Sequence, residues 1–210
     1  MANDNIIITV GRQFGSGGRE LGRRLAEALG YNYYDRELLN EAARREGVSE
    51  DLFATHDEKA PSIFSGLFPT SFGYGSMTGY GATGIGKSEA IYQMQAETIR
   101  SISEKESAVI VGRTADYALR DFLRCVNIFV HAPEKVCVER IMRRGEFANE
   151  HDALVACRKF NKLRASYYNF YTDKTWGMAS SYDLCFDSSK ISFDDMVEIV
   201  RLYIEKRFGK

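Results

Sequence analysis

A glycine-rich segment near the N-terminus constrains the fold of this chain more than any other feature. It follows Ile6–Val10, an apolar and mostly β-branched run whose length suits a strand buried on both faces. After the segment, Leu21, Leu25, Ala28 and Leu29 recur at helical spacing, and Gly30 stands where a helix C-cap is expected. The order strand, glycine loop, helix predicts one crossover of an α/β sheet.

The loop itself, Gly11 to Gly18, contains four glycines in eight residues. A glycine-rich turn from a strand into a helix presents backbone N–H groups and the positive end of the helix dipole, a combination that binds phosphate. The alternative is a tight turn that holds no ligand. The candidate phosphate-binding residues are Gly11, Phe14, Gly15, Ser16, Gly17, Gly18, Arg19 and Glu20.

This loop departs from the P-loop consensus, which ends in Gly-Lys-Ser/Thr with the lysine on the phosphates and the hydroxyl on Mg²⁺. Gly17-Gly18-Arg19-Glu20 occupies that place. Arg19 is the candidate replacement for the lysine, since a guanidinium suits phosphate oxygens. Glu20 is the candidate metal ligand, directly or through water. The alternative places both side chains on the surface of the first helical turn.

Four further short apolar runs complete the sheet that the sequence predicts, at residues 31–34, 107–111, 126–130 and 182–186. A chain of 210 residues suits a single α/β domain with an inserted segment. The formal net charge of -1 gives no reason to expect a nucleic acid or a membrane as partner. With no signal-peptide pattern at the N-terminus and no C-x-x-C pair, we expect a cytoplasmic protein with free thiols.

The run Gly15-Ser-Gly-Gly-Arg-Glu-Leu-Gly22 and the later Gly112-Arg113-Thr-Ala-Asp116-Tyr resemble the cytidylate kinase-like family. The resemblance extends over most of the chain. It implies a three-layer P-loop NTPase fold with a five-stranded parallel sheet, spanning residues 1–210 as one kinase-like domain. It also implies a flexible acceptor-binding insert at 48–90, a helical lid at 140–172, and ATP with Mg²⁺ as cofactors.

The same resemblance suggests roles for residues outside the loop. Asp35 and Arg36 follow the second strand, where relatives hold the acceptor nucleotide, although Asp35 also suits a plain helix cap. Arg113 and Asp116 follow the third strand, at the edge that faces the ligand crevice in open α/β sheets. The lid candidates, each weighed against a solvated surface role, are Arg140, Arg144 and Arg164.

A second stretch, Gly81-Ala-Thr-Gly-Ile-Gly-Lys87-Ser88, matches the P-loop consensus at every position. The match has meaning only where a buried strand precedes it and a helix follows. Ile91, Met94 and Ile99 predict the helix, but the preceding residues Ser-Met-Thr-Gly-Tyr contain no strand-like run. We therefore place the phosphate site at the N-terminal loop.

Together with these patterns, the resemblance implies a phosphotransferase that moves a phosphoryl group from ATP to a pyrimidine nucleoside monophosphate such as CMP. Two alternatives stay open: a nucleotide-binding regulatory protein without efficient turnover, and a P-loop kinase for another small metabolite. The partners expected are a nucleotide and a small phosphate acceptor. Whether the chain forms a homo-oligomer is left open by the sequence.

Overall fold

The computed structural model describes residues 4–35, 40 and 83–209, with side chains described from residue 89 onward in the last range. The helices and strands, in chain order, are β1 Ile7–Arg12, α1 Gly18–Leu29, β2 Asn32–Tyr34, α4 Thr83–Lys105, β3 Ala108–Val111, α5 Ala115–Ala118, β4 Cys125–His131, α6 Glu134–Arg143, α7 Glu150–Thr172, a 3₁₀ turn Ala179–Ser181, β5 Leu184–Asp187 and α8 Phe193–Phe208.

The strands form one five-stranded sheet in the order β2-β3-β1-β4-β5, and every neighbouring pair is parallel. All five lie at the positions that the sequence predicted, shifted by one or two residues at their ends. The first strand is the central one, so the loop that follows it leaves the middle of the carboxyl edge of the sheet. In an open parallel sheet this edge is where ligands bind.

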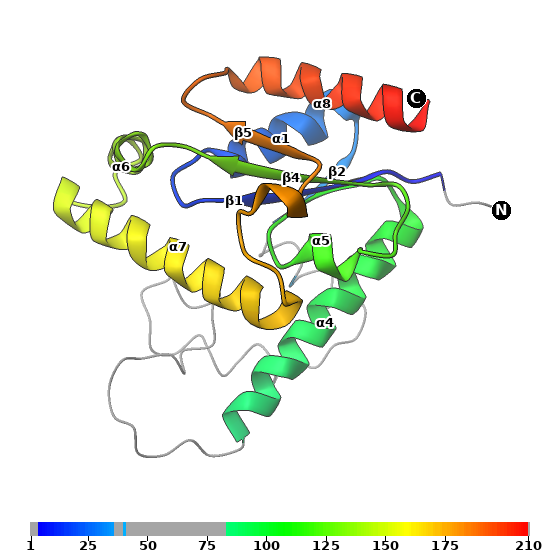
Figure 1. The fold of residues 1–210 in the computed structure, drawn as a ribbon, viewed down its shortest axis with the longest axis horizontal. Helices are drawn as coiled ribbons and strands as arrows, with labels where there is room; N and C mark the ends of the chain where they lie inside the picture. The colour runs from blue at the N-terminus through cyan, green and yellow to red at the C-terminus, as the bar shows by residue number, and fades with distance from the viewer. Residues whose placement is uncertain (1–3, 36–39, 41–82, 210) are drawn as a thin grey trace.

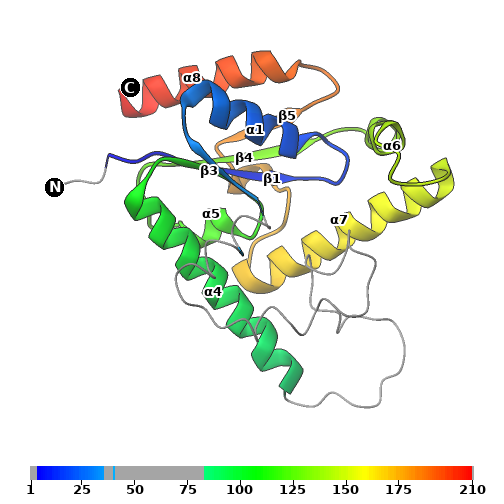
Figure 2. The same ribbon diagram turned by 180° about the vertical axis from the view of Figure 1, so that it is seen from behind.

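Helices cover the sheet on both faces, which gives three layers (Figures 1 and 2). Alternate residues of β1 point to opposite faces: Ile8 and Val10, with the preceding Ile6, pack with α1 and α8, whereas Ile7 packs with α4 and α5. Both faces of this strand are therefore buried, as its continuous apolar run predicted. A third apolar cluster joins α6 and α7 beside the loop after β1.

Local signals explain how α1 begins and ends. Its apolar side contributes Leu21, Leu25 and Ala26 to the core, while Ala28, which shares the predicted spacing, is exposed. Gly30 ends the helix in the left-handed conformation, with φ 67°, as its position suggested.

The predicted insert and lid correspond to particular elements. Residues 48–82 of the insert lie outside the described residues, and its last part, from Thr83, is helical as the start of α4. The lid range 140–172 contains the end of α6, the link after it and α7. Within the described residues, no helix combines the length and the apolar character that a membrane crossing requires.

Candidate active site

The loop between β1 and α1 has the backbone of an anion-binding turn. Gly15 and Gly17 adopt left-handed conformations, with φ 80° and φ 86°, and α1 begins at Gly18 without a side-chain cap. In the described part of the chain, no acceptor pairs with the backbone N–H groups of Gly15, Gly17 or Gly18. These donors and the positive end of the helix dipole are available to a ligand.

Gly15 also has no room for a side chain. A Cβ atom at this position would lie 2.6 Å from the carbonyl oxygen of Cys137 in α6. A glycine is therefore required here both for the positive φ and for the close approach of α6.

The other side of the loop is held by hydrogen bonds from distant parts of the chain. Ser16 is fully buried, and its carbonyl accepts from Arg140 Nη1 at 3.0 Å and from Ser188 Oγ at 2.6 Å. The N–H of Phe14 donates to Asn161 Oδ1 of α7 at 2.7 Å. These contacts fix the loop from behind, which leaves its glycine N–H groups on the open side.

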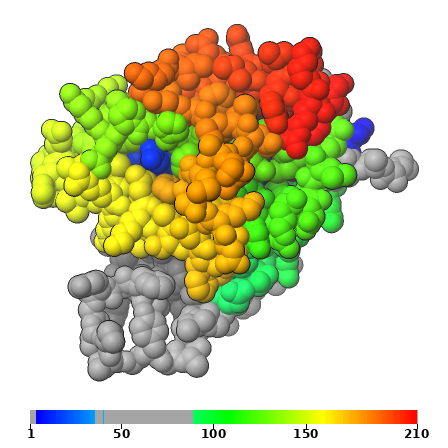
Figure 3. Space-filling model, viewed as in Figure 1, coloured from blue at the N-terminus to red at the C-terminus, as the bar shows by residue number. Residues whose placement is uncertain are grey.

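A cavity of about 790 Å³ opens over this loop. It is bordered by the loop, the start of α1, the turn after β3, and residues of α6 and α7. In the space-filling view the N-terminal segment shows in blue at the floor of a hollow beside the yellow α7 (Figure 3). Eight arginines line the cavity, against Glu20, Asp116 and Glu146 as its acidic residues, so it suits an anion with several charges. These arginines are Arg12, Arg19, Arg23, Arg113, Arg140, Arg143, Arg144 and Arg164.

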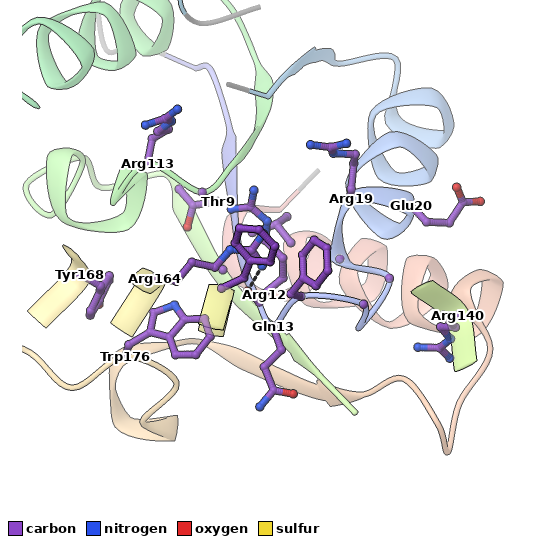
Figure 4. Close-up of a pocket in the computed structure, with 18 of the residues that line it drawn as sticks. Thr9, Arg12, Gln13, Arg19, Glu20, Arg113, Arg140, Arg164, Tyr168 and Trp176 are labelled. Atoms are coloured by element: carbon purple, nitrogen blue, oxygen red, sulfur yellow. Dashed lines mark hydrogen bonds between the residues drawn. The ribbon is translucent and has the colours of Figure 1, made fainter. Parts of the chain in front are cut away.

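Two of these arginines, Arg12 and Arg164, lie close together in the cavity and beside other cations (Figure 4). The pKa of Arg12 is lowered to about 10, mainly by burial and also by the charges of Arg19 and Arg113. The pKa of Arg164 is also lowered well below its usual value, mainly by burial and also by the positive charges of Arg12 and Arg19. Arg164 Nη1 donates to the carbonyl of Arg12 at 3.0 Å, but its buried Nε has no partner among the described residues. A bound anion would relieve both the repulsion and the missing hydrogen bond.

The predicted loop residues Arg19 and Glu20 point to different sides of α1 (Figure 4). Arg19 faces the cavity, and its Nε lies 4.0 Å from Asp35 Oδ2, with 53% of the arginine side chain exposed. The Glu20 carboxylate instead binds Arg24 Nε on the exposed surface, at 2.7 Å. The ion pair with Arg24 gives Glu20 a structural partner, although Glu20 also lines the cavity, and its metal role stays a prediction. Gly11 lies inside β1, packed against Phe129 and Tyr182.

The three predicted lid arginines have distinct surroundings. Arg140 is turned beneath the loop and donates to Ser188 Oγ and the Ser188 carbonyl, at 2.7 and 2.8 Å, as well as to Ser16. Arg144 pairs with Glu146 at 3.2 Å. The guanidinium groups of Arg144 and Arg164 lie 5.8 and 5.6 Å from the centre of the Phe14 ring. The structure therefore brings Arg144 and Arg164 to the cavity, whereas Arg140 also anchors the loop.

The turn after β3 carries the predicted acceptor residues. Arg113 and Thr114 both have positive φ, 60° and 51°, a strained backbone that is found mainly at functional sites. Asp116 accepts a hydrogen bond from the Tyr168 hydroxyl at 2.7 Å, and burial raises the pKa of its carboxyl group. Asp35 is buried at the end of β2. Arg36 lies outside the described residues.

Sequence reasoning did not identify two residues that the structure brings into the cavity. Arg12 is the last residue of β1, and a charged side chain directly after a buried run, at the carboxyl edge of a central strand, was the available signal. Trp176 also lines the cavity and packs edge-on against Phe129, with ring centres 5.3 Å apart.

Comparisons with known proteins agree with this fold. A model of the cytidylate kinase-like family matches residues 7–190. A cytidylate kinase from Methanosarcina barkeri is 28% identical over 212 residues, covering 96% of this chain and 98% of its own length. One from Pyrococcus furiosus is 25% identical and covers 95% of this chain and 88% of its own length.

Solved structures resemble the chain as well. An uncharacterized protein from Eubacterium ventriosum superposes with a TM-score of 0.72 at 29% identity, covering 97% of this chain and all of its own, 100%. A shikimate kinase from Bacteroides thetaiotaomicron gives a TM-score of 0.54 at 14% identity, covering 95% and 98%, which is a likeness of fold alone. With its glycine loop, parallel sheet and arginine-lined cavity, the chain belongs to the cytidylate kinase-like family and is a kinase-like phosphotransferase.

Proposed function

We propose that this protein transfers the γ-phosphoryl group of ATP to a pyrimidine nucleoside monophosphate such as CMP. The observation that carries the proposal is the arginine-lined cavity over a glycine loop whose N–H groups are unpaired within the described residues. The family, and the cytidylate kinases among its relatives, favour a nucleotide as acceptor.

In this reaction the protein positions the two substrates and stabilises the charge on the transferring phosphoryl group. A monophosphate oxygen of the acceptor attacks the γ-phosphorus, and the bond from that phosphorus to the β-phosphate oxygen of ATP breaks, which yields two diphosphates. The attacking oxygen is already anionic, so no general base is required. The loop N–H groups hold the donor phosphates, and Arg144 and Arg164 stabilise charge on the transferring group.

The acceptor monophosphate binds in the part of the cavity near the ends of β2 and β3. Arg113 lines the cavity at the end of β3, where its guanidinium suits an acceptor phosphate. Asp35 lies at the end of β2, opposite Arg19, where it suits a polar group of the acceptor. Asp116 lines the same cavity from the start of α5.

Magnesium fits this arrangement as an ion that arrives with ATP. Mg²⁺ keeps several waters and needs only one or two carboxylates beside substrate phosphates. Among the residues that the structure describes, no three His, Cys, Asp or Glu side chains gather at one point, so a cage made only of protein ligands is not seen there. Asp116 and Glu20 both line the cavity, and either carboxylate suits a direct or water-mediated contact with the ion, although Glu20 also pairs with Arg24. The metal would neutralise charge on the donor phosphates.

The test is a coupled ADP-release assay with ATP, Mg²⁺ and a panel of nucleoside monophosphates. We expect turnover with CMP, and with UMP or dCMP as weaker acceptors. If ATP binds by calorimetry while every monophosphate stays inert, the proposal is wrong. That outcome supports the regulatory alternative, and turnover with a non-nucleotide acceptor in the same assay supports the metabolite kinase.

A further inference from the structure

The position that a P-loop lysine would occupy is Gly18, and the space above Gly18 is already filled. A Cβ atom built on Gly18 would lie 2.4 Å from Cβ and 3.0 Å from Cγ of Arg12. Real Cβ atoms do not approach other carbons so closely, so no side chain can begin at Gly18 while Arg12 keeps its place. The missing lysine and the presence of Arg12 are therefore two sides of one packing arrangement.

The guanidinium of Arg12 reaches from the start of α1 to the end of β3. A Cβ atom on Gly112, the first residue after β3, would lie 1.8 Å from Arg12 Nη1 and 2.9 Å from Cζ. The side chain thus crosses the floor of the cavity between the phosphate loop and the turn that carries Arg113 (Figure 4). This is the region between the proposed donor and acceptor.

Arg12 also differs from its neighbours in its partners. Arg19 has Asp35, Arg140 has Ser16 and Ser188, and Arg144 has Glu146. Within residues 4–35, 40 and 83–209, no carboxylate or carbonyl binds the guanidinium of Arg12, which is half-buried. A guanidinium has five N–H donors, and a site that holds it beside other cations without an acceptor suits a ligand that supplies the acceptors.

We propose that Arg12 is the cation of this phosphate loop, supplied from the preceding strand in place of the lysine and binding the terminal phosphate oxygens of the donor. The planar guanidinium can bind two oxygens at once, which suits a polyphosphate. Arg19, the replacement that the sequence suggested, is then a positioning residue that pairs with Asp35. The inference rests on the proposed function for the identity of the donor, but not for the existence of the anion site.

The first experiment compares Arg12→Met with the matched control Arg19→Met, using calorimetry with inorganic triphosphate and with ATP. We expect Arg12→Met to weaken triphosphate binding by about 10- to 100-fold, the usual effect of losing charge-assisted hydrogen bonds. We expect Arg19→Met to weaken it by less than about 3-fold, since Arg19 is largely exposed and already paired. Equal losses in the two variants would overturn the proposal.

A second readout separates anion binding from a structural role. Arg12→Met keeps much of the side chain's volume but removes a charge that faces Arg19, Arg113 and Arg164, so the melting temperature without ligand should rise by about 2–4 °C. The gain in melting temperature on adding triphosphate should shrink in the same variant. A purely structural arginine would give the opposite first result, a lower melting temperature.

The third experiment moves the cation back to the consensus position. Arg12→Gly removes both Arg12 carbons that block Gly18, and Gly18→Lys then supplies a lysine from the start of α1. The double variant should recover at least about 10-fold of the triphosphate affinity that Arg12→Gly alone loses. No recovery in a double variant that is folded by circular dichroism contradicts the claim that the two positions exchange one role.

The experiments distinguish failure of the role proposed for Arg12 from failure of the proposed function. If the wild-type protein binds triphosphate through Arg12 but phosphorylates no monophosphate, the proposed function fails and the role of Arg12 stands. If Arg12→Met phosphorylates CMP with an unchanged KM for ATP, the role of Arg12 fails and the proposed function stands.

Discussion

Two glycine-rich helix starts in this chain look alike in sequence and differ in structure. The segment before α1 departs from the P-loop consensus, yet it follows the central strand and opens into the cavity. The segment from Gly81 to Ser88 matches the consensus at every position, yet from Thr83 onward it is already helix α4. Its helix start lies well away from the carboxyl edge of the sheet in both views (Figures 1 and 2).

The difference shows that a phosphate site depends on where the backbone is held. At the first start, Arg140, Ser188 and Asn161 fix the loop by hydrogen bonds, and α6 presses against Gly15. Several N–H groups and arginines therefore converge on one cavity. Glycines and a lysine in the same order cannot do this inside a helix, where successive side chains point around the axis.

The sharpest test of this comparison is one alanine substitution at each start. Gly15→Ala should weaken ATP binding by about 100-fold or more, because the new Cβ meets the Cys137 carbonyl and the residue must hold a positive φ. Calorimetry with ATP measures the effect.

The matched control is Gly86→Ala, within α4. Alanine is favoured over glycine in a helix by roughly 0.5–1 kcal/mol, so this variant should keep the ATP affinity of the wild type and melt slightly higher. A loss of affinity in Gly86→Ala that matches the loss in Gly15→Ala would break the comparison.

A smaller effect tests the anchoring of the first loop. Arg140→Met removes hydrogen bonds to the Ser16 carbonyl and to Ser188. Hydrogen bonds to charged groups contribute about 1.5–3 kcal/mol, so we expect ATP affinity to fall about 10-fold and the melting temperature to fall by several degrees. Arg158→Met is the control, because Arg158 is exposed, lies outside the cavity lining and pairs with Glu134 on the surface, at 2.8 Å. If the two variants behave alike, the anchor has no role in binding.

Sequence patterns were sufficient for the sheet and for the position of the glycine loop at its carboxyl edge. A buried parallel strand has an apolar run with few alternatives, and a glycine cluster between such a run and a helix predicts a sharp turn, whose phosphate binding stays a prediction. The runs at Ile6–Val10 and Val126–Val130 therefore identified β1 and β4. The resemblance to the family added the order of the layers, which periodicity alone does not determine.

The division of roles among the arginines was beyond sequence reasoning. Arg140 and Arg144 are four residues apart at the end of α6, yet one reaches back to Ser16 and the other pairs with Glu146. Arg12 was overlooked because its position depends on empty space at Gly18 and Gly112, in segments that are distant in the chain. Contacts of this kind depend on tertiary packing, which local patterns do not contain.

A modest effect on stability tests Asp116, a carboxylate that lines the same cavity. Burial raises the pKa of the Asp116 carboxyl group above its value in the unfolded chain, so the ionised carboxylate destabilises the fold. The contribution of the neutral carboxyl group to folding stability is fully present below the unfolded pKa. It is lost as the pH rises through the folded pKa. Asp116→Asn keeps an acceptor for Tyr168 without the charge. Its melting temperature should exceed that of the wild type by about 2–4 °C at pH 7, and the difference should vanish near pH 3.5. A difference that does not change with pH would assign the effect to packing.

The smallest expected effect is the most direct attempt to break the comparison. Lys87 stands where the consensus places its phosphate-binding lysine, but its backbone belongs to α4 and not to a loop at the end of a strand. Replacing it with methionine should leave the calorimetric ATP affinity unchanged, with Arg12→Met measured beside it as the variant that loses binding. A true P-loop lysine makes charge-assisted contacts whose loss costs at least about 10-fold. A loss of that size in Lys87→Met would show that Lys87 contacts the donor phosphates. The donor site would then be assigned to the start of α4 and not to the first loop.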